Sequence, residues 1–150
     1  MKILNMHGYN GSSENTACTV LKQLGHEVIS PQIDYDAKTP SRIHRDLKNI
    51  FNENKPDYIV GTSLGGFFAL LLSQEFKKPT VLVSPCLCPY ITLPELGYKG
   101  NIRTYMKLFG SIPEDLRNIS AVVGGMDEVI KYHGFTENLI ENCHIVPDGR

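Results

Sequence analysis

Residues 57–72 of the chain read DYIVGTSLGGFFALLL. The first four are typical of a β-strand, and the residues from Gly66 onward are typical of an apolar helix, so the five between them, GTSLG, form a strand-to-helix turn. A turn this abrupt forces the residue at its centre into a strained backbone conformation and exposes its side chain. The stretch therefore predicts a nucleophile elbow with Ser63 as the nucleophile. The alternative is a tight turn that carries no chemistry.

Two backbone amides are candidates for holding an oxyanion beside Ser63. The amide of Leu64 begins the helix, and the loop HGYNGSS at 7–13 follows the first predicted strand. Acyl transfer needs two donors aimed at one oxygen, and the amides of Tyr9 and Leu64 are the natural pair. The glycines of the loop could instead only turn the chain. We expect the side chain of His7 to be structural, because the base of such a site comes late in the chain.

An acid follows a later strand. The run ISAVV at 119–123 predicts a strand, and Asp127 comes after the two glycines that end it. The chain order Ser, acid, His is the one found with a nucleophile elbow, so Asp127 is the candidate third member of a triad. Its task would be to hold the imidazole in the right tautomer and to stabilise its charged form. The alternative is that Asp127 caps a following helix.

Strand-like and helix-like runs alternate along the whole chain, which predicts an α/β fold. We expect a mainly parallel sheet of about six strands with helices on both faces, forming a single domain over residues 1–150 without a large cap domain. The stretch from Pro85 to Glu114 is predicted to be irregular. Its part from Pro85 to Phe109 is expected to pass over Ser63, where it either shapes an acyl site or anchors itself to the core. The predicted strands are 3–6, 27–30, 57–60, 80–83, 119–123 and 143–146, and the predicted helices are 15–24, 40–53, 66–72 and 134–141.

Composition narrows the function classes. Fifteen Lys and Arg against sixteen Asp and Glu give a formal net charge of −1 without a basic block, so we expect no nucleic-acid partner. The longest apolar run, 67–72, is far shorter than the ~18 residues of a membrane span, so we expect no membrane partner and a cytoplasmic protein. We expect the four cysteines to be free thiols rather than disulfides or a metal site. Asp34 and Asp36 are expected to form a solvated turn.

Four segments together carry a family resemblance: HGYNGSS at 7–13, GTSLGG at 61–66, the Ser-Pro pair at 84–85 and GMDEVI at 125–130. They resemble the small bacterial YqiA-like esterases of the α/β-hydrolase superfamily. The resemblance implies a compact α/β-hydrolase fold that cleaves a small-molecule ester or thioester through a Ser, Asp, His triad. We expect no cofactor and no metal.

The expected base is the point at which the chain departs from this resemblance. In those esterases the histidine follows the last strand in a Gly-x-His loop, and Gly149 and Arg150 match the first two positions of that loop. We therefore expect the catalytic histidine directly after Arg150, in a chain shortened at its C-terminus. The other candidates are His133, expected on a helix surface, and His144, expected in the last strand with one face buried.

A second function, from a different class, is also consistent with this sequence. A catalytically silent α/β-hydrolase domain could bind a small acyl ligand or a protein partner and keep the elbow only as structure. A histidine in the Gly-x-His position would favour the enzyme over this alternative.

Overall fold

Six parallel strands form one sheet in the computed structural model, which describes residues 1–110, 115–131 and 133–150. The strand order is β2-β1-β3-β4-β5-β6, and every neighbouring pair is parallel, so the carboxyl ends of all the strands meet at one edge of the sheet. The predicted parallel sheet is confirmed. The strands are β1 (Lys2–Met6), β2 (Glu27–Ile29), β3 (Tyr58–Thr62), β4 (Thr80–Val83), β5 (Ile119–Gly124) and β6 (Asn142–Val146).

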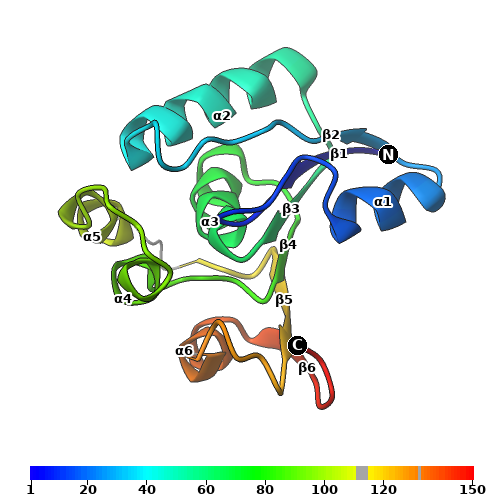
Figure 1. The fold of residues 1–150 in the computed structure, drawn as a ribbon. Helices are drawn as coiled ribbons and strands as arrows, with labels where there is room; N and C mark the ends of the chain where they lie inside the picture. Colours follow the sequence, from blue (N-terminus) through cyan, green and yellow to red (C-terminus); the bar gives the residue numbers. More distant parts are fainter. Residues whose placement is uncertain (111–114, 132) are drawn as a thin grey trace.

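Helices cover the two faces of the sheet unequally (Figure 1). Helix α1 lies on one side, and α3, α4, α5 and α6 lie on the other, with α2 packed against α3 and α5. The helices are α1 (Thr16–Gln23), α2 (Pro40–Asn54), α3 (Leu64–Phe76), α4 (Pro89–Glu95), α5 (Arg103–Phe109) and α6 (His133–Leu139). Among the described residues, none of these helices has both the length and the apolar character that a membrane span requires.

Helix α3 is the centre of the core. Its first ten residues, Leu64 to Ser73, are all buried, as expected for a helix that is apolar on every side. Helix α2 buries only one stripe, formed by Pro40, Ile43, Leu47 and Phe51, and its other residues are partly or fully exposed. The apolar run that follows Ser63 therefore fixes the elbow to the most deeply buried element of the domain.

Two predictions about the fold were wrong. The stretch predicted to be irregular, Pro85 to Glu114, contains α4 and α5, although its last four residues, 111–114, lie outside the described part of the chain. The last strand was expected to have one face buried at His144, but four of the five residues of β6 are exposed, His144 among them, because β6 forms the edge of the sheet. The four cysteines are free thiols, as predicted.

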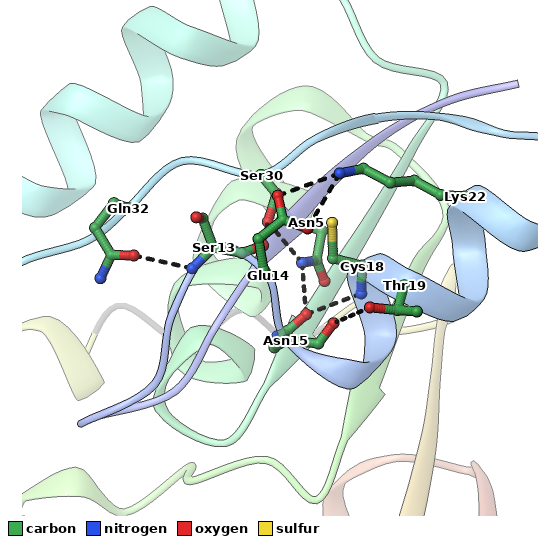
Figure 2. A network of polar contacts seen from close by, with 9 residues as sticks. All are labelled: Asn5, Ser13, Glu14, Asn15, Cys18, Thr19, Lys22, Ser30 and Gln32. Carbon is green, nitrogen blue, oxygen red and sulfur yellow. Dashed lines mark hydrogen bonds and ion pairs between the residues drawn. The ribbon is translucent and has the colours of Figure 1, made fainter.

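The loop between β1 and α1 is anchored at its far end by side-chain amides (Figure 2). The Asn5 side-chain amide donates to Asn15 Oδ1 at 3.0 Å and to Ser30 Oγ at 2.9 Å. Asn15 Oδ1 also accepts from the Cys18 amide at 2.9 Å and so caps α1. The Ser30 hydroxyl in turn donates to the Ser13 carbonyl. The network ties the end of the loop to β1, to α1 and to the segment that follows β2.

Candidate active site

Ser63 occupies the turn between β3 and α3, with φ at 51° and ψ at −121°. A non-glycine residue with positive φ costs about 1–3 kcal/mol and persists only where its surroundings hold it. Here the Ser63 amide donates to the Val83 carbonyl at 3.0 Å, and the Ser63 carbonyl accepts from the amides of Gly66 and Cys86, both at 2.9 Å. The predicted strand-to-helix turn is present, and contacts with three neighbouring segments hold it in its strained conformation.

The elbow lies where the strand order reverses. From β1 the chain goes to β2 on one side and then to β3 on the other, and ligands of such sheets bind in the crevice outside the carboxyl ends of the strands at this point. Gly8 follows β1 and Ser63 follows β3. A β-carbon built on Gly8 would lie only 2.8 Å from the Ser63 Cβ, so the loop after β1 and the elbow are in direct contact.

Gly65 allows α3 to pack closely on β1. A β-carbon built on Gly65 would lie 2.6 Å from the His7 carbonyl oxygen and would also collide with the carbonyl of Met6. Both atoms belong to the backbone at the end of β1 and cannot move without displacing the sheet. The second glycine of the elbow motif is therefore required by packing.

We expect Gly65→Ala to lower the free energy of unfolding by about 1–3 kcal/mol or more, because the added methyl group meets fixed backbone. Gly134→Ala is the matched control: no atom lies within 4 Å of a β-carbon there, and alanine is a better helix former than glycine, so stability should rise slightly. Urea unfolding followed by circular dichroism measures both. Equal effects of the two changes would contradict the close packing of α3 on β1.

The two predicted oxyanion donors are adjacent to the elbow. Leu64 is the first residue of α3, so its amide belongs to the helix turn whose N–H groups have no intrahelical acceptor. Tyr9 follows Gly8, which contacts Ser63. In the described part of the chain, neither amide donates a hydrogen bond to another group.

His7 is structural, as expected. It is buried; its Nδ1 donates to the Gly8 carbonyl at 2.7 Å, and its Nε2 accepts from the Ile33 amide at 2.9 Å. Both ring nitrogens are therefore engaged with the backbone, and the ring holds the loop after β1 against the segment that follows β2.

Asp127 lies in the loop after β5 and is held by three hydrogen bonds. Its Oδ1 accepts from the amides of Val129 and Ile130, both at 2.9 Å, and its Oδ2 accepts from His133 Nε2 at 3.0 Å. Burial alone would raise the pKa of this carboxyl, but the hydrogen bonds from Ile130, His133 and Val129 together hold the pKa below its usual range. Asp127 is therefore an ionised, fixed carboxylate at neutral pH.

The histidine that contacts Asp127 is His133. We expected it on a helix surface, but its side chain is only 11% exposed, because it turns inward at the start of α6 to meet the carboxylate. Its Nε2 donates to Asp127, and its Nδ1 is buried without a partner among the described residues. The nitrogen that could still accept a proton is thus enclosed by protein.

His144 does not join this group. It lies on the edge strand β6 beside Val122 and is exposed, where we had expected one face to be buried. In the described part of the chain, its side chain makes no hydrogen bond or ion pair.

The C-terminal residues run alongside the loop that carries Asp127. The Met126 amide donates to the Gly149 carbonyl at 2.9 Å, and the Gly125 amide donates to the Val146 carbonyl at 2.8 Å. A β-carbon built on Gly124 would lie 2.6 Å from the same Gly149 oxygen. The two segments are in backbone contact one residue before Asp127.

Ser84 carries part of the family resemblance, but its strained backbone was not predicted. It has φ at 40° and follows β4, which lies between the strand of Ser63 and the strand that leads to Asp127. The proline that follows marks a turn, but the sequence does not show that this turn gives Ser84 a positive φ. Beyond it, the chain returns to the elbow, where a β-carbon built on Gly66 would lie 2.8 Å from the Pro85 Cβ.

Neither the thiol beside the elbow nor the acids after β2 suggest another chemistry. Burial raises the pKa of Cys86 to about 11, so its thiol is protonated at neutral pH. Asp34 caps a turn by accepting from the Ala37 amide, and Asp36 accepts from the Tyr9 hydroxyl. Among the described residues, no three His, Cys, Asp or Glu side chains form a group that could hold a metal ion.

Comparison with solved structures identifies the fold. The chain is similar to a putative hydrolase of the α/β superfamily from Xanthomonas campestris pv. campestris, with a TM-score of 0.68 at 19% identity over 99% of this chain and 86% of that one. It is similar to the ydeN gene product of B. subtilis, with a TM-score of 0.68 at 16% identity over 97% and 84%. For alpha/beta hydrolase domain-containing protein 10 from mouse, the TM-score is 0.67 at 15% identity over 99% and 80%. The predicted α/β-hydrolase fold is confirmed.

Comparison with protein families gives a match over most of the chain. The model of the uncharacterised protein family UPF0227 matches residues 2–107, which include the loop after β1 and the whole elbow. The resemblance to YqiA-like proteins of the α/β-hydrolase superfamily is confirmed by this match together with the fold. The chain belongs to the UPF0227 family.

Proposed function

We propose that this protein is a serine hydrolase that cleaves a small carboxylic ester or thioester through an acyl-enzyme on Ser63. The observation that carries the proposal is the backbone of Ser63, which has positive φ at the carboxyl end of β3 and touches Gly8 across the switch point of the sheet. Strain of this kind is kept at functional sites because it places a side chain where regular structure could not. The fold shared with α/β hydrolases supports the same reaction class.

Each neighbouring group has a role in this reaction. Ser63 Oγ attacks the acyl carbon, and the amides of Tyr9 and Leu64 stabilise the oxyanion that forms. The carboxylate of Asp127 orients the base and stabilises its charged form. Strands β3 and β5 are separated by β4 alone, so about 10 Å lie between them, a gap that an imidazole placed between Ser63 and Asp127 could bridge.

We infer that the base is a histidine carried directly after Arg150. The contacts of Gly149 with Gly124 and Met126 support this position, because the residue after Arg150 then emerges beside the loop of Asp127. His133 already bonds to the carboxylate, but through Nε2, and its Nδ1 is enclosed. We assign to His133 the role of fixing the carboxylate, and none in catalysis to His144.

Labelling with a fluorophosphonate, followed by peptide mass mapping, tests the proposal. The reagent should modify Ser63 alone in a chain that carries a histidine after Arg150, because among the described serines only Ser63 stands at a strand-to-helix turn beside the two proposed oxyanion donors. Ser63→Ala should abolish labelling. Ser84→Ala is the matched control, since Ser84 is the other described serine with positive φ, and it should leave labelling intact.

Two results would overturn this assignment. Modification of another serine would transfer the nucleophile's role to that residue. If Ser63 is modified neither in the 150-residue chain nor in the form with a histidine after Arg150, the result favours the catalytically silent domain. That domain would bind an acyl ligand or a protein partner without turning it over.

A further inference from the structure

Two tyrosines and a carboxylate gather beside the elbow. Tyr9 follows Gly8, the residue that touches Ser63, and its ring meets that of Tyr98 at a centroid distance of 6.0 Å. The Tyr9 hydroxyl donates to Asp36 Oδ1 at 2.8 Å. Three separate segments, after β1, after β2 and between α4 and α5, therefore converge at the carboxyl edge of the sheet.

The two rings form a corner that is supported from behind. The planes of Tyr9 and Tyr98 meet at 81°, and Tyr98 rests on Tyr105 at 5.9 Å and 78°. Tyr105 is fully buried against Phe67 and Phe68, so the wall behind the corner belongs to the core. Tyr9 and Tyr98 are only partly buried, and each keeps part of its surface in solvent.

The charge at this corner is negative, and no cation among the described residues forms an ion pair with it. Asp36 is exposed and takes part in no ion pair among the described residues, and Lys38, two residues further on, is bound to Asp46 at 2.8 Å. The hydrogen bond to Asp36 is the main cause that raises the pKa of Tyr9. Burial and then the charge of Asp36 raise the pKa of Tyr98. The field of the carboxylate thus reaches both rings.

We propose that Tyr9, Tyr98 and Asp36 form a subsite for an organic ammonium group on the substrate. Aromatic faces set at right angles, with a carboxylate at their edge, are how proteins recognise quaternary ammonium groups. The subsite rests on the proposed hydrolase function, in which the Tyr9 amide faces the reacting carbonyl oxygen, so the Tyr9 side chain is one residue from the chemistry. The preferred substrates are then esters of cationic amino alcohols.

Choline is the probe for binding, which does not depend on turnover. Titration of the 150-residue chain, followed by NMR, should show saturable shifts, and Asp36→Asn should weaken binding about tenfold while still accepting the Tyr9 hydrogen bond. Tyr98→Leu should weaken it by a similar factor. Asp34→Asn removes the same charge two residues away; the asparagine oxygen can still accept from the Ala37 amide, so the turn is kept and binding should be unchanged. Equal effects of the two Asp→Asn changes would overturn the subsite.

Turnover gives a second measurement in the form with a histidine after Arg150. Acetylcholine should have a kcat/KM at least tenfold above that of 3,3-dimethylbutyl acetate, which replaces the ammonium nitrogen by carbon, and Asp36→Asn should bring the ratio close to one. Suppose that a fluorophosphonate labels Ser63, but that choline at high concentration gives no NMR shifts and does not slow this labelling. The subsite is then wrong and the hydrolase function stands. If choline binds through Asp36 but Ser63 is never labelled, the subsite stands and the hydrolase is wrong.

Discussion

The 150-residue chain is expected to hydrolyse 4-nitrophenyl acetate about 10⁶-fold more slowly than a form extended by a short tail whose first residue is histidine. Loss of a triad histidine has an effect of this size, because nothing else takes the proton from the attacking hydroxyl. Oxyanion stabilisation and binding alone still leave about 10³–10⁴ over the reaction in water, so the short chain should show a small signal. Initial rates of the two forms give the ratio directly.

The proposed base also predicts the direction in which activity changes with pH. In the extended form, kcat/KM should rise with pH through the histidine range near ~6.5, because the imidazole accepts the Ser63 proton only when neutral. Asp127 should not limit activity there, because its pKa is held below its usual range and it remains ionised.

Three variants test whether the base has been correctly assigned. A tail that begins with alanine should leave the activity as low as that of the 150-residue chain. His133→Ala and His144→Ala, made in the 150-residue chain, should change little. Full activity of the unextended chain that disappears in one of these two variants would identify that histidine as the base and contradict our assignment.

Asp127→Asn is expected to lower hydrolysis by up to about 10⁴-fold in the extended form, with little change in the free energy of unfolding. The amide oxygen of asparagine can still accept from the Val129 and Ile130 amides, so the loop keeps its shape. The negative charge that orients and stabilises the imidazolium is lost, however, and in other triads the equivalent change leaves the wrong tautomer. Steady-state kinetics and urea unfolding measure the two effects separately.

Glu128→Gln is the matched control for this variant. Glu128 is the neighbouring acid in the same loop, but it is exposed and makes no ion pair with the described residues. Its replacement should alter activity by no more than a few fold. If both variants lose activity to a comparable extent, the total negative charge of the loop is what matters, and no single carboxylate orients the base.

The parts of the fold that could be predicted are those fixed by local pattern. The elbow, the strand before Asp127 and the parallel sheet follow from short apolar runs and glycines that the printed sequence displays directly. Helices α4 and α5 could not be predicted, because each has only seven residues and α4 contains Pro94, which leaves no readable period. The contact of His133 with Asp127 depends on how α6 begins. The exposure of His144 depends on the position of β6 at the edge of the sheet. Neither this contact nor this exposure can be read from the residues that surround each histidine in the sequence.

The amide network of Figure 2 has a consequence for the energetics of the reaction. The loop that presents Tyr9 to the elbow is fastened at one end by Asn5, Asn15 and Ser30, and at the other by the ring of His7. Ordering a free loop costs conformational entropy each time a ligand demands it. Here that entropy is lost once, when the chain folds, so the Tyr9 amide, our proposed oxyanion donor, would already be in place when a substrate binds.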